Sequence, residues 1–192
     1  MKPVATAISC LLGCALTVGA GQTPLQSQVE SSLDSGSSRA EIHDLIVKMT
    51  DNPVPVVAEI AQSDHESYAR RTRAIYLLAT FKTKRSGDIL TEIAEHSSAT
   101  LRCPALEALA ELRSKDAIPT LIRKLDDRAV CMQKTLTDPP RQQEVYVSDE
   151  AVRLLEQVTG QSFLQERADG HRPTKPWKDW WAKQKRSAEP GL

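Results

Sequence analysis

Aromatic side chains are scarce in this chain, at 4% of 192 residues, although 40% of the residues are hydrophobic. Leucine, isoleucine, valine and alanine must therefore build the core. A β-sandwich would need more aromatic and β-branched residues, so the composition favours helices. An excess of one charge is also missing, because Lys+Arg and Asp+Glu each number 25. This balance gives no sign of nucleic-acid binding, which calls for a basic total or a basic face.

Motifs for catalysis and cofactor binding are also missing. The chain contains neither a G-x-x-x-x-G-K-[ST] or G-x-G-x-x-G nucleotide loop nor a G-x-S-x-G motif. His65, between Asp64 and Glu66, could in principle hold a metal, but a solvated helix start explains it better. Asp126 and Asp127 fit a helix end better than acid–base catalysis. The histidines lie far apart, at His43, His65, His96 and His171. We therefore predict no enzyme, no metal site and no cofactor.

The N-terminal segment, residues 1–20, carries no charge beyond one lysine and ends in the small residues VGA. It resembles a signal peptide, so we expect cleavage after Ala20 and a mature chain that begins at Gly21. The alternatives are a buried helix, a membrane anchor, or a lipobox in LLGC that would lipidate Cys14 and give a surface lipoprotein. We expect export, to the periplasm or the medium. Residues 21–38, rich in Ser and Gln, are predicted to be a linker.

Three segments share one hydrophobic register, counted from Arg71, Arg102 and Ser148. Apolar residues recur at offsets +3, +4, +7 and +10, which fall on one face of a helix. Alanine at +3 would let a neighbouring helix approach closely. The residues at these offsets are Ala74, Ile75, Leu78 and Phe81; Ala105, Leu106, Leu109 and Leu112; and Ala151, Val152, Leu155 and Val158.

Second helices should follow the first two of these segments. After the segment that begins at Arg71, a turn at Gly87 with Asp88 as N-cap predicts a second helix. After the segment that begins at Arg102, Asp116 as N-cap and Pro119 in the first turn predict another. The third segment follows an insertion, residues 128–147, and lacks a clear second helix. Neither helix of a pair can bury its apolar stripe alone, so the pairs must stack and share a core.

The stretch LRCPALEALAELRSKDAIPTLIRKLDD resembles one repeat of the HEAT family, including the HEAT-like repeats named after phycobilin lyases. The features that carry the resemblance are Arg102, Ala105, Leu106, Leu109, Ile118, Pro119, Leu121, Leu125, Asp126 and Asp127. It implies an all-α fold, a short right-handed α-solenoid of HEAT-like helix pairs over residues 39–160. In that family the Arg and the closing Asp often interact between neighbouring repeats. Residues 161–192 would form a tail with a tryptophan-containing cap helix.

Two cysteines, Cys103 and Cys131, remain in the body of the protein once the signal segment is removed. In an oxidising compartment such a pair is a disulfide candidate. The helices of a pair run antiparallel, so the start of the first helix and the end of the second should lie at the same end. The alternative is two separate buried thiols.

The resemblance says little about function, because the family serves scaffolding, transport and assembly. We expect a non-catalytic scaffold or adaptor outside the cytoplasm that binds an unidentified protein along the second helices. We expect no nucleic-acid partner, and a membrane partner only if the N-terminal lipobox is used. The alternative is an accessory or lyase-like protein that holds a small ligand between repeats, which would need a buried polar cluster.

Candidate partner-binding residues fall into two groups. Arg70, Arg71 and Arg73 concentrate positive charge on the first clear repeat, where a solvated face is the simpler explanation. We expect reversal of these three charges to affect partner capture more than stability. The tryptophans of the tail share one helical face and either cap the last repeat or form a contact surface; they are Trp177, Trp180 and Trp181.

Overall fold

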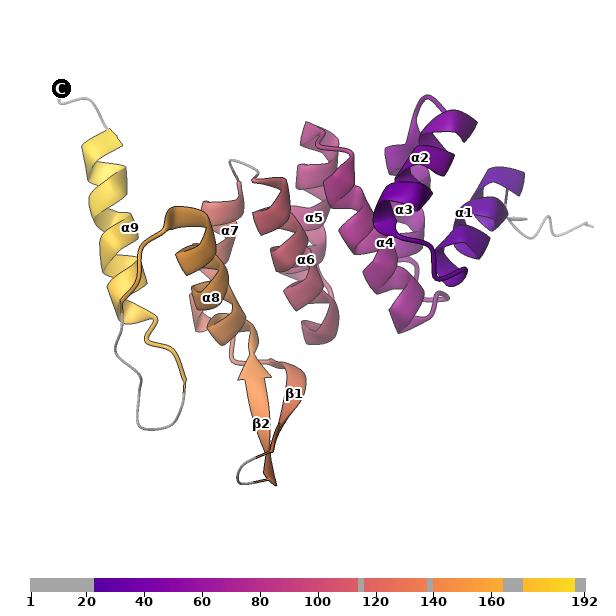
Figure 1. Ribbon diagram of the computed structural model, residues 1–192. Helices are drawn as coiled ribbons and strands as arrows, with labels where there is room; N and C mark the ends of the chain where they lie inside the picture. The colour runs from indigo at the N-terminus through magenta and orange to yellow at the C-terminus, as the bar shows by residue number, and fades with distance from the viewer. Residues whose placement is uncertain (1–22, 114–115, 138–139, 164–170, 189–192) are drawn as a thin grey trace, which may run out of the picture.

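The computed structural model describes residues 23–113, 116–137, 140–163 and 171–188 (Figure 1). The expected cleavage after Ala20 and the lipidation of Cys14 lie outside these ranges. The elements in chain order are α1 (Pro24–Asp34), α2 (Arg39–Met49), α3 (Pro53–Gln62), α4 (Tyr68–Thr80), α5 (Lys84–His96), α6 (Ala99–Leu112), α7 (Ala117–Arg123), the 3-10 turn η1 (Lys124–Asp126), β1 (Val130–Thr137), β2 (Pro140–Tyr146), α8 (Val147–Thr159) and α9 (Lys175–Ala188).

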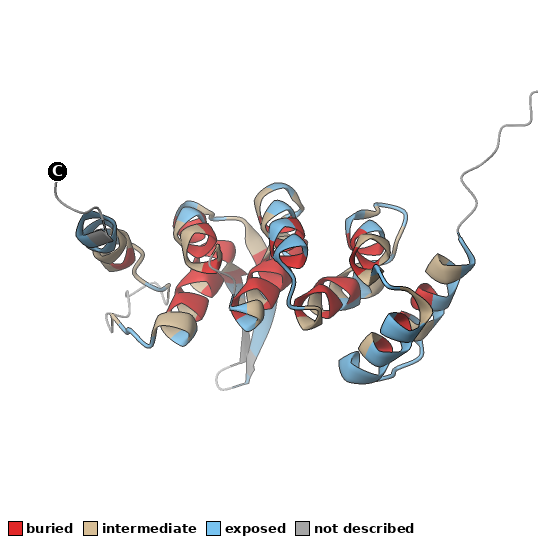
Figure 2. Cartoon of the chain, turned by 90° about the horizontal axis from the view of Figure 1, so that it is seen from above, coloured by how far each residue is buried: buried red, intermediate tan, exposed pale blue. Residues whose placement is uncertain are grey.

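Most of the helices stack in two rows. One row, here called the first-helix row, contains α4, α6 and α8, with α2 against α4 at its N-terminal end. The second-helix row contains α3, α5 and α7, and α9 lies beside α7. Buried residues lie mainly where the helices of the two rows face one another (Figure 2). The expected all-α solenoid is therefore confirmed. None of the helices in the described ranges is long and apolar enough to cross a bilayer.

The shared register explains how the first-helix row packs. Ala74, Ala105 and Ala151, all at offset +3, are each 0% exposed. They belong to α4, α6 and α8, which contact one another in that order. A methyl side chain at this position lets the neighbouring backbone come close while the larger aliphatic residues one turn away fill the core. The register predicted from the sequence thus corresponds to the contact seam of the row.

Helix starts follow local capping chemistry, with one correction. Ser38 and Glu41 form the expected capping box at α2. The start predicted at Asp88 is wrong, because α5 begins one turn earlier, where the Thr83 hydroxyl accepts a hydrogen bond from the Ser86 backbone N–H. Gly87 is therefore a buried helical residue rather than a turn.

The linker prediction for residues 21–38 is also wrong, because this range contains α1. Thr23 caps the helix and Pro24 occupies its first turn, where a missing N–H does no harm. Val29 and Leu33, one turn apart, are fully buried. They pack α1 against α2, α3 and α4, so α1 covers the N-terminal end of the stack.

The insertion at residues 128–147 forms an antiparallel hairpin, β1–β2, that projects from the side of the solenoid (Figure 1). Lys134 pairs with Gln143 in its register, and an irregularity lies between Val130 and Met132, at the hairpin base. A two-stranded hairpin is only marginally stable alone. The position of the β1–β2 hairpin therefore depends on how it is attached to the helices.

Candidate functional site

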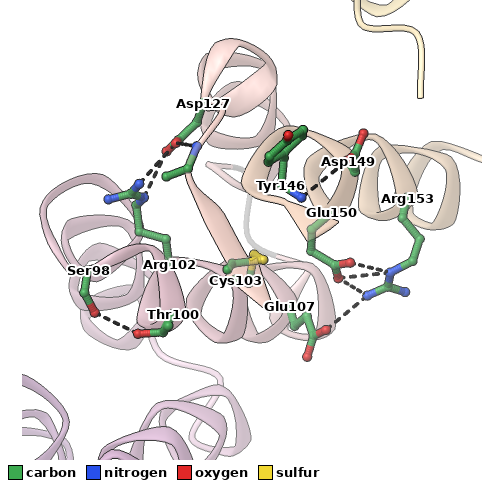
Figure 3. Close-up of a disulfide and its surroundings, with 12 residues drawn as sticks. Ser98, Thr100, Arg102, Cys103, Glu107, Asp127, Tyr146, Asp149, Glu150 and Arg153 are labelled. Atoms are coloured by element: carbon green, nitrogen blue, oxygen red, sulfur yellow. Dashed lines mark hydrogen bonds and ion pairs between the residues drawn. A yellow bond between two sulfur atoms is a disulfide. The ribbon is translucent and has the colours of Figure 1, made fainter. Parts of the chain in front are cut away.

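The base of the hairpin is fixed by the expected disulfide between Cys103 of α6 and Cys131 of β1 (Figure 3). The two Cα atoms lie 6.3 Å apart, within the normal range. Both residues are buried, and the bond ties the insertion to the repeat that precedes it. The antiparallel geometry expected from the sequence accounts for this closeness.

Arg102 explains why a basic residue begins the register. Its guanidinium donates to the Ser97 carbonyl at the end of α5, over 2.8 Å. Its Nε lies 2.9 Å from Asp127 Oδ2 (Figure 3). Asp127 also accepts from the Ala129 backbone N–H. An arginine at this place satisfies a carbonyl that a helix end leaves open. The Arg–Asp contact lies within one repeat rather than between neighbouring repeats.

The three arginines expected on a binding face are instead used inside the chain. Arg70 contacts Asp34 over 2.5 Å and Glu66 over 2.6 Å. Arg71 donates to the Ala61 carbonyl and pairs with Asp64, and Arg73 donates to the Leu33 carbonyl. These contacts tie α4 to α1 and to the end of α3. The three side chains therefore do not form a free basic patch, and their first role is structural.

Replacing Arg70 with alanine should lower the free energy of unfolding by about 1–3 kcal/mol, because its carboxylate partners lose charge-assisted hydrogen bonds. This reverses the sequence-based expectation that these charges matter mainly for partner capture. Urea denaturation, with limited proteolysis of α1, measures the effect. Arg85→Ala is the control, since Arg85 is exposed. Equal stability of both variants would restore the binding-face interpretation.

Trp177 and Trp180 act as the cap that one sequence interpretation proposed. Trp177 is 0% exposed, and the Phe163 ring meets it edge-on with centroids 4.9 Å apart. Trp180 packs partly on the core. Lys178 pairs with Asp126, which fixes α9 to the end of the second-helix row. Trp181 remains partly exposed and is not packed on the core.

A polar cluster crosses the first-helix row. The Tyr76 hydroxyl of α4 donates to Glu107 of α6, and Arg153 of α8 lies 3.2 Å from Glu107 Oε1. Arg153 also binds Glu150, whose residue exposure is only 3% (Figure 3). We call these four side chains the first-helix cluster. It is a partly buried polar cluster that the sequence did not reveal.

A second ion pair extends the cluster toward the N-terminus. Arg39 of α2 pairs with Glu111 of α6 over 2.7 Å and lies over the Tyr76 ring, 5.5 Å from its centroid. Both ion-pair partners are about half exposed. A cavity of about 520 Å³ opens beside them, lined by Arg39, Tyr76, Glu107, Glu111, Arg153, Leu154 and Gln157. Charged, aromatic and amide groups from four helices thus share one surface.

Burial changes the proton affinity of the cluster. Burial raises the pKa of Glu107 above its ordinary value of 4.5, and the Glu150 carboxylate adds to this rise. The Tyr76 hydroxyl and Arg153 oppose it but do not outweigh it. Burial, together with the hydrogen bond to Glu107, also raises the pKa of Tyr76. The cluster therefore holds a proton more tightly than isolated carboxylates would.

The raised pKa of Glu107 predicts a pH dependence of stability. The folded state binds this proton more tightly than the unfolded state, so stability falls as pH rises from the unfolded pKa through the folded pKa. Glu107→Gln should remove that fall while keeping an acceptor for Tyr76. Denaturation curves at several pH values measure this: the free energy of unfolding of the variant should rise relative to that of the wild type as the pH approaches neutrality.

The matched control for Glu107→Gln is Glu111→Gln, one turn further along α6 and exposed. Its stability relative to the wild type should not gain in this way toward neutral pH. A Glu107→Gln difference that stays constant across the same pH range would show that burial does not perturb Glu107.

A second cavity, of about 360 Å³, lies where the hairpin meets α8. His171 Nδ1 is 2.8 Å from Asp149 Oδ2, and the His171 ring stacks on Tyr146. Lys134 and Arg172 also line this cavity. Its charges are mixed and no motif for a nucleophile accompanies them. Within the described residues, no group of three His, Cys, Asp or Glu side chains is placed to hold a metal ion.

Sequence reasoning missed the first-helix cluster, although a signal was present. Tyr76, Glu107 and Arg153 each stand at offset +5 from the origins of the shared register. Residues at +9 lie one turn further along the same helix face, and these include Glu111 and Gln157. The apolar offsets define the core. The polar offsets define the outer face of the same row.

Stacked helix pairs with one shared core define an α-solenoid repeat protein. Residues 54–131 match the family model described as HEAT repeats, so this part of the chain contains HEAT repeats. HEAT repeats generally act as non-enzymatic scaffolds for protein–protein interactions. No curated protein matches the chain, and no solved structure matches it.

Proposed function

We propose that this protein is a non-catalytic scaffold that binds a protein partner on the outer face of the first-helix row. The observation that carries this proposal is the continuous set of polar and aromatic side chains across α2, α4, α6 and α8. Arg39, Glu111 and Gln157 are exposed, and together with the partly buried Glu107 and Arg153 they line the cavity. Aromatic and arginine side chains are common anchors of protein interfaces.

This face replaces the second-helix face expected from the sequence. In the second-helix row, Arg123 and Lys124 of the α7–η1 segment bind Glu95 of α5 over 2.7 Å each. That cluster links only neighbouring helices of its row. The first-helix cluster instead borders a cavity of about 520 Å³ that a partner side chain can enter. The first-helix face is favoured because four helices contribute side chains to it, whereas the Glu95 cluster involves only α5 and the α7–η1 segment.

The proposed location is outside the cytoplasm, in the periplasm or the medium. The Cys103–Cys131 bond supports it, because structural disulfides persist in oxidising compartments and are rare in the cytosol. The apolar segment at residues 1–20 is consistent with export. The intact mass of the protein recovered from its host tests this: a chain beginning at Gly21 supports secretion, and a lipidated Cys14 supports the surface-lipoprotein alternative.

A second candidate function is the holding of a small ligand between repeats. The first-helix cluster and its adjoining cavity favour it, because binding sites for small molecules combine a cavity with a few converging polar groups. A native mass spectrum of protein purified from its host distinguishes the two functions. A retained small molecule would favour ligand binding, and a bare chain would favour the scaffold.

Site-specific photocrosslinking in the native host tests the proposed face. A photoreactive residue at Glu111 or Gln157 should capture the same protein partner from both positions. The same residue at Asp88 or Glu92 of α5, which are also exposed, serves as the matched control and should not capture it. Capture from the α5 positions alone would place the binding face on the second-helix row and contradict the proposal.

A further inference from the structure

The C-terminal helix α9 carries a concentration of positive charge in a chain that is neutral overall. Its sequence, KPWKDWWAKQKRSA, contains five basic residues and one acidic residue. The whole chain has equal numbers of basic and acidic residues. The charge of α9 is therefore a local feature that the composition conceals.

The basic residues of α9 divide into two groups. Those in its first half are paired, Lys175 with Asp179 and Lys178 with Asp126. Those in its second half, Lys183, Lys185 and Arg186, are exposed, and none forms an ion pair among the described residues. The Arg186 guanidinium donates only to the Ala182 carbonyl of its own helix. The first half of α9 is thus fixed to the solenoid, and the second half carries positive charges without ion-pair partners among the described residues.

Indole rings accompany these charges. Trp177 is buried and holds the helix in place, whereas Trp181 is partly exposed and is not packed on the core. The Lys185 ammonium lies over the Trp181 ring, 5.6 Å from its centroid. Tryptophan and lysine on one surface helix are typical of helices that lie at the boundary between water and a bilayer.

The position of α9 leaves this surface open to a large, flat partner. Figure 1 places α9 at the C-terminal end of the stack, with no described element on its outer side. Its three exposed basic residues, Lys183, Lys185 and Arg186, lie within about one turn near the C-terminal end of the helix. The positive charge that they concentrate at this end of α9 fits a negatively charged surface.

We propose that α9 binds the solenoid to the surface of a bilayer that contains anionic phospholipid. The exposed basic residues attract the lipid headgroups, and Trp181 enters the interface beside them. The helix lies on the bilayer and does not cross it. This contact is separate from the first-helix face, so a membrane-bound scaffold keeps that face free for a protein partner.

The test uses the full-length protein and vesicles of equal parts phosphatidylglycerol and phosphatidylcholine. All three tryptophans of the chain lie in α9, so intrinsic fluorescence reports on this helix alone. We expect the protein to sediment with these vesicles and its emission to shift to shorter wavelength. Added salt should weaken binding by screening the charges. Sedimentation with no change in emission would mean that another surface binds, and would overturn the proposal.

The decisive variant replaces Lys183, Lys185 and Arg186 with glutamine. Each basic residue near an anionic surface contributes about fivefold to binding, so the triple variant should bind roughly 100-fold more weakly. The matched control replaces two lysines and one arginine elsewhere, Lys82, Lys84 and Arg85, and should bind like the wild type. An unchanged affinity of the α9 variant, or an equal loss in the control, would contradict the proposal.

Two further outcomes would also overturn it. The wild type and both triple variants all contain residues 1–20. Equal binding of the protein to pure phosphatidylcholine vesicles and to the anionic vesicles would mean that this apolar segment binds the lipid instead of α9. A failure to bind anionic vesicles, together with α9-dependent binding of polyglutamate, would assign α9 to an acidic protein partner instead.

Discussion

Removal of the Cys103–Cys131 disulfide should lower the free energy of unfolding by about 3–4 kcal/mol. The bond closes a loop across a sequence separation of 28 residues, which restricts the unfolded chain. It also fixes the base of a hairpin that has little core of its own. Residual structure in the reduced unfolded state would make the loss smaller.

Denaturant unfolding of the oxidised wild type, the reduced wild type and a Cys103→Ala/Cys131→Ala variant measures this loss. The free energies of unfolding of the reduced protein and of the variant should both be lower than that of the oxidised protein, by similar amounts. Thiol labelling of the denatured, unreduced wild type should find neither Cys103 nor Cys131 free. A double variant as stable as the oxidised wild type would show that the bond contributes nothing.

The second large effect is expected at the C-terminal cap. Trp177→Ala should lower the free energy of unfolding by about 3–5 kcal/mol, the range for truncation of a fully buried aromatic side chain. The reason is that α9 covers the open end of a repeat stack, where apolar surface would otherwise meet water. Loss of the indole also removes the edge-on partner of Phe163.

Trp181→Ala is the matched control, because Trp181 lies one helical turn further on and outside the core. Thermal and urea unfolding should show a change within about 0.5 kcal/mol for this variant. If Trp177→Ala unfolds like the control, α9 is not a structural cap, and all three tryptophans become candidates for partner binding.

The repeat architecture could be predicted because its signals are local and recur. Arg71 and Arg102 lie in the first turns of α4 and α6 and satisfy carbonyls at the end of the preceding helix, and a fully buried alanine follows each at +3. The disulfide followed from antiparallel helix geometry and from the inferred compartment. Each of these inferences needed only one or two helices at a time.

The parts that sequence reasoning missed have different physical causes. The helix α1 had a cap at Thr23 and buried residues at helical spacing, Val29 and Leu33, but its serines and glutamines suggested a linker. The first-helix cluster depends on which neighbouring helices meet, so Glu107 and Arg153 could be matched only after stacking was known. The roles of Arg70 and Arg73 depend on the unexpected α1.

The central claim, a partner-binding face on the first-helix row, is tested most directly by carboxyl footprinting of the captured complex. Labelling followed by mass spectrometry compares Glu111, on that face, with Glu59 and Glu92, exposed on α3 and α5. Partner binding should protect Glu111 and leave Glu59 and Glu92 as reactive as in the free protein. Protection of Glu59 and Glu92 with no change at Glu111 would contradict the claim.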